Sequence, residues 1–274
     1  MKKIIFSTGL PRAMSTLMCN ILANNPKIGG GETSPLLEYL GQVRTVFSRT
    51  PEVQASLTEE IVTNAYLNFL RHGIEGYSQS ITPKEIYLDK SRGWIHYTSF
   101  LKRIIPDAKI IVMVRDLRAI IASLEKKRRE HSHIMDGREV LQGRDFTTME
   151  HRVNSYLSDL PLNPTLFRLR NAIQTKEIEN MLVVRAEDLC SNPTETMTRV
   201  YKYLEIPYCE LDYNNIAQVT IENDRIQDYS IYGDHKIRPN VKPLEKDYED
   251  VLGKEICNQI KQNNQWFYDY FKYY

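Results

Sequence analysis

The beginning of the chain constrains the fold more than any other segment. Ile4–Phe6 form a short apolar run that is typical of a strand, and a turn containing Gly9 follows it. Ser15 and Thr16 then begin a segment whose apolar residues recur at helical spacing. Parallel α/β proteins build anion sites from this succession, because the free N–H groups of the first helical turn face the ligand. The segment therefore predicts an α/β fold with an anion site on its first loop, where Arg12 adds a planar cation.

This loop differs from the loop that binds nucleoside triphosphates. That loop reads GxxxxGK followed by Ser or Thr, and the lysine is missing here. Taken alone, the segment leaves two interpretations open, which are an anion site and an ordinary turn between strand and helix with an exposed Arg12.

Composition limits the class of protein. With 274 residues, of which 42% are hydrophobic, the chain is long enough for one large domain, and we expect a single domain over residues 1–274. The 36 basic and 35 acidic residues nearly cancel, which argues against steering of the whole chain towards nucleic acid. No window approaches the ~20 apolar residues of a membrane span, and the first residues lack the ~7–15 apolar residues of a signal peptide.

The four cysteines are scattered, without CxxC or metal-ligand spacing. Such thiols are typical of a cytoplasmic protein whose cysteines stay reduced and buried. We therefore expect a cytoplasmic protein with no membrane partner, no nucleic-acid partner and no metal. The cysteines are Cys19, Cys190, Cys209 and Cys257.

Strand-like runs alternate with helical patterns along the chain. Alternation of this kind predicts a central parallel sheet flanked by helices. The expected strands are Lys3–Ser7, Glu85–Asp89, Lys109–Val114 and Met181–Arg185. The expected helices are Ser15–Asn24, Pro35–Ser48, Leu57–His72, Ile95–Ile105, Arg118–Glu130, Met149–Leu160, Thr165–Glu179, Thr194–Leu204 and Tyr248–Phe271. The polar region Asp212–Lys246 shows neither pattern, and an irregular stretch of that length is usually functional or mobile.

Charged and hydroxyl side chains follow the expected strands at the point where each one ends. Arg12 follows the first strand, Lys90 the second and Arg115 the third. Ligands of open parallel sheets bind beyond the carboxyl ends of the strands, so these side chains should gather on one rim. Ser123 lies on the helix after Arg115, and helical side chains tilt towards the helix N-terminus. We therefore expect two anion sites, one at the first loop and one held by Arg115 and Ser123.

Each of these residues also has an ordinary structural interpretation. Arg115 and Arg118 can form surface ion pairs with Asp116 or Glu125, and Ser123 can be an ordinary serine of a helix. Their joint placement on one rim favours anion binding.

The residues of the two expected anion sites resemble the cofactor motifs of sulfotransferases. Gly9–Leu17 is similar to the 5′-phosphosulfate loop of that family, GxPRSGTTL, and Val114–Arg118 with Ser123 is similar to its 3′-phosphate motif. Within the family, tyrosylprotein sulfotransferases look closest, through the PRAMSTLM, NNP and GGGET stretches. The likeness continues in Asp89-Lys90 and in Asp234–Pro239, which is similar to a DQVIKP segment beside the adenosine.

The resemblance implies a P-loop-like three-layer α/β fold and a cofactor, 3′-phosphoadenosine 5′-phosphosulfate (PAPS), which leaves as PAP. It implies in-line sulfuryl transfer to an acceptor hydroxyl without a metal. Glu32 is then the general base, and Arg12 and Lys90 neutralise charge on the leaving phosphate and the sulfuryl group. The residues implied to bind the cofactor are Arg12, Ala13, Met14, Ser15, Thr16, Arg115, Ser123, Lys127, Tyr232, Lys236, Ile237 and Arg238.

The chain departs from the family pattern at several of these positions. Met14 stands where the family has glycine and Ala13 where it has serine, so Met14 would be strained if the position requires a positive φ. Ala186 replaces a family tyrosine. A single Glu32 stands where the protein-tyrosine branch has two acidic residues, and a solvated carboxylate in a glycine-rich turn is its alternative interpretation.

Two other functions compete with sulfuryl transfer. One is a small-molecule kinase of the P-loop class, which the missing lysine disfavours. The other is a non-catalytic PAP-binding protein of the same fold, which the changes at Ala13 and Met14 would suit. The sequence leaves open whether the acceptor is a small molecule, a carbohydrate or a tyrosine, and it leaves the oligomeric state open.

Overall fold

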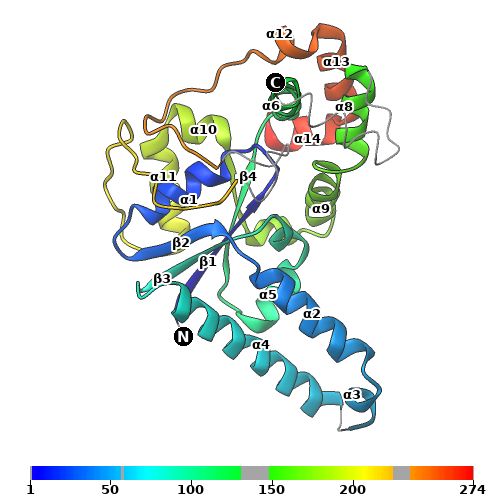
Figure 1. Ribbon diagram of the computed structural model, residues 1–274, viewed down its shortest axis with the longest axis vertical. Helices are drawn as coiled ribbons and strands as arrows, with labels where there is room; N and C mark the ends of the chain where they lie inside the picture. The colour runs from blue at the N-terminus through cyan, green and yellow to red at the C-terminus, as the bar shows by residue number, and fades with distance from the viewer. Residues whose placement is uncertain (1, 57–58, 131–147, 225–234, 274) are drawn as a thin grey trace.

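A five-stranded parallel sheet forms the centre of the computed structural model, which describes residues 2–56, 59–130, 148–224 and 235–273. The strand order is β2-β3-β1-β4-β5, and all the pairs are parallel (Figure 1). The strands are β1 (Lys3–Gly9), β2 (Ile28–Thr33), β3 (Ile86–Lys90), β4 (Lys109–Val114) and β5 (Leu182–Arg185). β1 and β4 occupy central positions and are apolar on both faces, so the expected α/β fold with a parallel sheet is confirmed.

Helices flank both faces of this sheet. Figure 1 shows α1 and α11 on one side of it and α9 on the other, while α2 and α4 project from the body as a long hairpin. The helices that precede β5 are α1 (Ser15–Ala23), α2 (Leu36–Arg49), α3 (Pro51–Ser56), α4 (Glu59–Ile81), α5 (Thr98–Ile104), α6 (Leu117–Glu130), α8 (Met149–Ser158) and α9 (Asn163–Gln174). The later ones are α10 (Ala186–Ser191), α11 (Pro193–Leu204), α12 (Tyr248–Leu252), α13 (Lys254–Asn263) and α14 (Gln265–Phe271). Short 3-10 turns cover Arg92–His96 and Glu177–Asn180.

Strand β2 was missed by the sequence analysis, which expected no strand between Ser15–Asn24 and Pro35–Ser48. The strand pairs in parallel with β3, and its glycines are required by close packing. A Cβ on Gly30 would lie 2.6 Å from the Leu88 carbonyl oxygen, and a Cβ on Gly29 would lie 2.1 Å from Thr82 Oγ1. Gly30 and Gly31 also have φ values of 90° and 106°. Glycine lowers strand propensity, so no local pattern identified this edge strand.

The single helix expected over Tyr248–Phe271 was also wrong, because the structure divides it into α12, α13 and α14. The chain turns at Gly253, with φ 81°, and again at Asn264. Apolar residues keep their helical spacing across both breaks, since all three helices bury one face on the same core.

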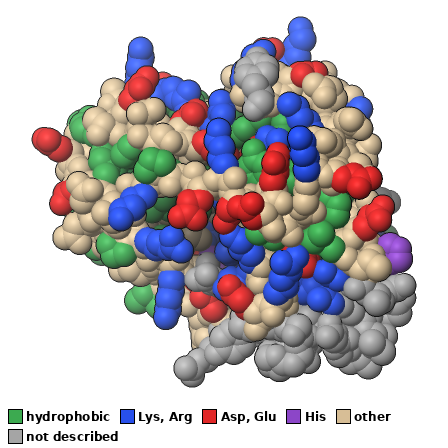
Figure 2. Space-filling view, turned by 90° about the horizontal axis from the view of Figure 1, so that it is seen from above, with side chains coloured by type: hydrophobic (Ala, Val, Ile, Leu, Met, Phe, Trp, Pro, Cys, Tyr) green, Lys and Arg blue, Asp and Glu red, His purple; other side chains and the backbone are tan. Residues whose placement is uncertain are grey.

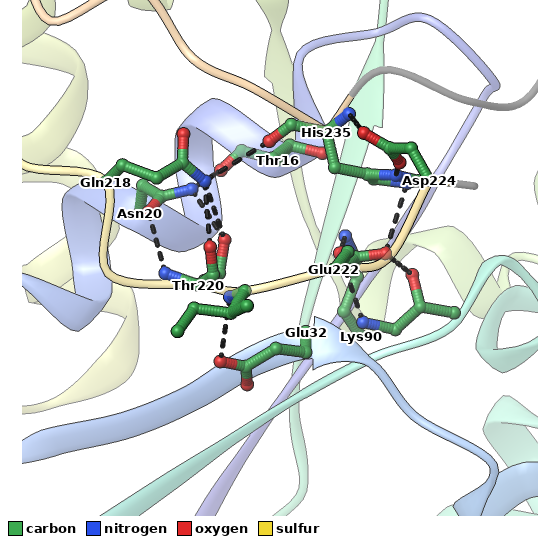
Figure 3. Close-up of polar contacts among 11 residues, drawn as sticks. Thr16, Asn20, Glu32, Lys90, Gln218, Thr220, Glu222, Asp224 and His235 are labelled. Atoms are coloured by element: carbon green, nitrogen blue, oxygen red, sulfur yellow. Dashed lines mark hydrogen bonds and ion pairs between the residues drawn. The ribbon is translucent and has the colours of Figure 1, made fainter. Parts of the chain in front are cut away.

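The described part of the region 212–246 contains neither helix nor strand, as expected. We call its residues 216–224 the strap, because they cross the end of β2 next to α1 (Figure 3). Asn20 anchors the strap: its Oδ1 accepts the Val219 and Thr220 N–H groups at 2.8 and 3.1 Å, and its Nδ2 donates to Thr220 Oγ1 at 2.8 Å. No helix among the described residues is long and apolar enough to cross a membrane.

Candidate active site

The loop between β1 and α1 is held in a left-handed conformation. Arg12 and Met14 have φ values of 58° and 62°, and Met14 directly precedes the first helical residue, Ser15. The position of Met14 therefore has the positive φ under which the sequence analysis expected a non-glycine residue to be strained. A non-glycine residue there costs about 1 kcal/mol. Gly9 begins the loop, and a Cβ on it would lie 2.2 Å from the Met113 carbonyl oxygen, so the loop passes close against β4.

The first turn of α1 lies at the carboxyl end of β1. Ser15 and Thr16 are half-buried and are the first two residues of the helix, where backbone N–H groups lack helical partners. The Ala13 side chain is completely buried in the core, so only its backbone can face a ligand. The predicted placement of Ser15 and Thr16 at a helix start is thus correct.

The first and third loops meet each other. Arg12 Nε donates to Ser123 Oγ at 3.1 Å, and Arg115 Nη1 donates to the Arg12 carbonyl oxygen at 2.9 Å. The sequence analysis paired Ser123 with Arg115 and assigned Arg12 to a separate anion site, whereas here Ser123 contacts Arg12. The two expected anion sites are therefore neighbours, joined through Arg12.

Arg115 is half-buried, and its Nε atom is removed from solvent without a hydrogen-bond partner among the described residues. Desolvation lowers the pKa of the Arg115 guanidinium below its ordinary value, the Glu187 charge raises it, and the neighbouring Arg12 lowers it further. A cation with a desolvated, unpartnered donor favours a bound anion. Arg118, by contrast, forms the structural ion pair that was its alternative interpretation, with Nη2 2.6 Å from Asp116 Oδ2.

Lys90, at the end of β3, is ion-paired with Glu222 of the strap (Figure 3). The Glu222 carboxylate also accepts from the Thr33 N–H at 3.2 Å and from the Thr33 hydroxyl at 2.8 Å, and His235 Nε2 lies 3.2 Å from it. His235 in turn contacts Asp224. Sequence reasoning gave no role to Glu222 or Asp224, for which its signal was that a long irregular region is usually functional. Thr33 and His235 lay within the family-like stretches GGGET and Asp234–Pro239, but neither was proposed as a site residue.

A buried network fixes the end of β3. Tyr87 Oη donates to Asp89 Oδ2 at 2.7 Å, and Trp94 Nε1 donates to Asp89 Oδ1 at 2.6 Å. Burial raises the pKa of the Asp89 carboxyl, while hydrogen bonds from Ser34, Tyr87 and Trp94 lower it, and the net result is a raised pKa. This network holds the backbone at Lys90 in place.

Glu32 lies on β2, half-buried, at the edge of a cavity of about 490 Å³. Its Oε1 accepts from the Ile221 N–H of the strap at 3.4 Å. Aromatic and aliphatic residues such as Tyr77, Tyr87 and Ile221 line the cavity together with polar ones such as Thr33 and Ser34. Glu32 and Lys90 thus contact neighbouring residues of the strap, Ile221 and Glu222 (Figure 3).

The remaining predicted site residues are less closely involved. Lys127 Nζ lies 3.1 Å from Glu130 Oε2 in the last turn of α6. Lys236 and Arg238 are exposed, and the Ile237 N–H donates to Gln218 Oε1 at 2.8 Å, which ties this segment to the strap. Tyr232 lies outside the described residues. Figure 2 views the molecule from above, and basic and acidic side chains lie side by side around the middle of the face that it shows.

The described residues contain no group of three or more His, Cys, Asp or Glu side chains arranged to hold a metal ion. The residues of the site offer cations, hydroxyls, backbone N–H groups and carboxylates. Such groups suit the binding of an anionic ligand and proton transfer to or from a hydroxyl.

Comparison with known proteins identifies relatives of this chain. The family model described as "Sulfotransferase family" matches residues 5–210. Protein-tyrosine sulfotransferase A of Caenorhabditis elegans is 24% identical over 212 residues, which is 74% of this chain and 50% of that protein. Protein-tyrosine sulfotransferase 1 of Danio rerio is 26% identical over 216 residues, or 75% of this chain and 54% of that protein. The chain thus spans about half the length of these curated relatives.

A solved structure shows the same fold. The sulfotransferase domain from the curacin biosynthetic pathway superposes with a TM-score of 0.58 at 16% identity, covering 96% of this chain and 97% of that domain. At this identity, the likeness shows the three-layer fold alone.

Proposed function

The chain belongs to the sulfotransferase family, and we propose that it transfers a sulfuryl group from PAPS to an acceptor hydroxyl. The single observation that carries this proposal is the meeting of the two cofactor loops at Arg12, Ser123 and the half-buried Arg115. This cluster lies at the carboxyl end of the sheet, beside the free N–H groups at the start of α1.

The residues present fit PAPS on structural grounds. The buried Nε atom of Arg115 is suited to a phosphate oxygen, since a buried donor without a partner destabilises the protein. The loop passes so close to β4 at Gly9 that no side chain fits between them. Ser15, Thr16 and the backbone of the first loop would hold the 5′ end, and Arg115 with Ser123 would hold the 3′-phosphate.

PAPS supplies the activated sulfuryl group when bound. Lys90 would neutralise negative charge that develops near the end of β3, where the Asp89 network keeps its backbone fixed. Glu32 would accept the proton of an acceptor hydroxyl that enters the adjoining cavity. Arg12 lies on the first loop and reaches Ser123 near the third, so its charge would act on the phosphate groups at both ends of the nucleotide.

The acceptor is proposed only as a hydroxyl compound. Two matched relatives are named protein-tyrosine sulfotransferases, which supports a tyrosine hydroxyl as the first acceptor to examine. The aromatic and aliphatic residues lining the cavity beside Glu32 also suit a phenol. Small phenols and tyrosine peptides are therefore the first acceptors for an assay.

Ligand-dependent thermal stability tests the proposed class of function. PAP at a hundredfold excess over its dissociation constant should stabilise the folded protein by ~2.7 kcal/mol, because it binds only the folded state. PAPS should act similarly, and ATP with magnesium should have little effect. Stabilisation by ATP with magnesium but not by PAP would instead establish the kinase alternative.

The catalytic assignment is tested by Glu32→Gln. Transfer from labelled PAPS should fall about 10²–10⁴-fold, while the dissociation constant of PAP should stay within about twofold. Glu38→Gln, at an exposed carboxylate in the first turn of α2, is the matched control and should leave both quantities unchanged. Loss of PAP affinity in Glu32→Gln would remove Glu32 from the role of base. PAP binding without transfer in the unaltered protein would favour the non-catalytic alternative.

A further inference from the structure

Four donors converge on one carboxylate of the strap. Glu222 Oε1 contacts the Lys90 ammonium and accepts from the Thr33 N–H at 3.2 Å. Glu222 Oε2 accepts from the Thr33 hydroxyl at 2.8 Å, and His235 Nε2 lies 3.2 Å from the same oxygen. The donors come from the end of β2, the end of β3 and the segment after the strap (Figure 3). Each carboxylate oxygen therefore has two partners.

The ion pair at the centre of this cluster is nearly removed from solvent. The Lys90 and Glu222 side chains are each 8% exposed. An ammonium, a hydroxyl, a backbone N–H and an imidazole that surround one buried anion form an anion-binding site rather than a surface ion pair.

Asp224 fixes the orientation of His235. Asp224 Oδ1 contacts His235 Nδ1, and Asp224 Oδ2 accepts the His235 backbone N–H at 3.0 Å. Ionised carboxylates only accept hydrogen bonds. The imidazole therefore bridges the two carboxylates, with Nδ1 on Asp224 and Nε2 directed at the Glu222 oxygen.

The proposed function gives Lys90 a different anion. Lys90 neutralises the sulfuryl group and the leaving phosphate there, but in this structure its ammonium is engaged by Glu222. A carboxylate and an anionic sulfuryl group repel each other if they share the same donors. The Glu222 carboxylate therefore has to leave this position before an anionic donor molecule can use Lys90.

We infer that the Glu222 carboxylate occupies the place of the sulfuryl oxygens, so that Thr33 and His235 bind the sulfuryl group together with Lys90 once Glu222 has moved away. This inference rests on the proposed function. In the transfer, the acceptor oxygen forms a bond to sulfur, the bond between sulfur and the 5′-phosphate oxygen breaks, and that phosphate keeps the electron pair. The acceptor proton passes to Glu32, while His235 and Thr33 donate to the sulfuryl oxygens throughout.

The ratio of two dissociation constants isolates the sulfuryl group. PAPS and PAP differ only in that group, so the Kd of PAP divided by the Kd of PAPS reports its contacts without requiring turnover. Titration calorimetry on the full chain, with no acceptor present, gives both constants. Thermal melting of each variant verifies that it is folded.

His235→Asn keeps an amide that can reach Asp224 but removes the donor that faces Glu222. We expect about tenfold weaker PAPS binding and a PAP constant within about twofold, so that the ratio falls about tenfold. His235→Gln places an amide donor near the original Nε2 and should restore part of the ratio. His72→Ala, at an exposed histidine paired with Glu75, is the control and should not change the ratio.

Glu222→Gln should change the ratio in the opposite direction. It removes the competing negative charge and keeps the size of the side chain, so PAPS should bind several-fold more tightly than in the unaltered protein. Weaker PAPS binding in Glu222→Gln, or equal losses of PAP and PAPS affinity in His235→Asn, would overturn the inference and leave the proposed function standing. Failure of the unaltered protein to bind either nucleotide would overturn the proposed function itself.

Discussion

The two cationic parts of the candidate site are built in different ways. On the β4 side, Arg12 and Arg115 donate to a hydroxyl and a carbonyl oxygen, and their positions are fixed by regular elements that begin within a few residues. On the β3 side, Lys90 is neutralised by Glu222, a residue 132 positions away on an irregular segment. On the β4 side the two guanidinium groups thus tie the two loops together through neutral oxygens, whereas on the β3 side the ammonium is held against a carboxylate of the strap. In a site for a nucleotide with charge at both ends, the side chains at one end can be positioned in advance while those at the other end are engaged by a residue of the protein itself.

The largest effect is expected from the buried carboxylate that holds α6, the helix of Ser123. Glu125 is completely buried; Arg152 donates to its two oxygens at 2.7 and 2.9 Å, and Arg129 donates at 2.9 Å. Glu125→Gln removes one member of a buried ion cluster and should lower the free energy of unfolding by about 3–5 kcal/mol. Urea denaturation measures the loss. A loss below about 1 kcal/mol would show that this network does not support the β4 side.

The same carboxylate gives a pH dependence of defined sign. Burial raises the pKa of Glu125, but hydrogen bonds and charge from Arg152 and Arg129 lower it more, and the net result is a lowered pKa. The stabilisation by the ionised Glu125 is therefore fully present above the pKa of the unfolded chain, about 4.5. It is lost as the pH falls through the lower pKa of the folded protein. The stability difference between the unaltered protein and Glu125→Gln should stay constant near neutral pH and shrink below about pH 4.5.

Arg115 tests whether the β4 side is the nucleotide end of the site. Arg115→Gln should weaken PAP binding by about 1.5–3 kcal/mol, roughly ten- to hundredfold, because a charged hydrogen bond to phosphate is lost. Arg44→Gln, at a cation that stacks on Tyr97 and Phe100 beside the α2–α4 hairpin, is the control and should bind PAP normally. Calorimetry provides both affinities. Equal PAP affinity in Arg115→Gln and the unaltered protein would remove Arg115 from the site.

The same difference decides how much the sequence could predict. The β4 side lies in short contiguous motifs, so the strand Lys109–Val114, the helix that follows it and the placement of Arg115 at the end of that strand were anticipated. Strand β2 was not anticipated, because its three glycines give no strand signal in the sequence. The glycines are required by close packing against Thr82 and Leu88, which only the fold reveals.

Glu222 could not be found from the sequence for a different reason. Its position depends on contacts with Lys90, Thr33 and His235 that involve distant parts of the chain and follow no periodicity. The family match ends at residue 210, so it gave no guidance on the strap either. Side chains brought together by an irregular segment are visible only once the fold is known.

Asn20 tests whether the strap is the less firmly held part. Asn20→Ala removes the acceptor of the Val219 and Thr220 N–H groups and should lower stability by about 1–2 kcal/mol. Limited proteolysis should cut the strap faster in this variant, while hydrogen exchange of α6 stays the same. Asn24→Ala, which loses one bond to the Ala217 carbonyl oxygen, should have a smaller effect. Faster exchange in α6 as well would show that the two sides are not separate units.

The smallest effect is expected at Met14, and its sign separates strain from function. Met14 has a φ of 62° at the start of α1, so Met14→Gly should relieve backbone strain and stabilise the folded protein by about 1 kcal/mol, less whatever packing the methionine contributes. Met14→Ala loses the same side chain but keeps the strain, so the difference between the two variants isolates the backbone contribution. If glycine stabilises the protein and leaves PAP affinity unchanged, the left-handed loop is already formed before the nucleotide binds. If PAP binds more tightly to Met14→Gly, the loop has to adjust on binding, and the β4 side is then less fully prepared than its contacts indicate.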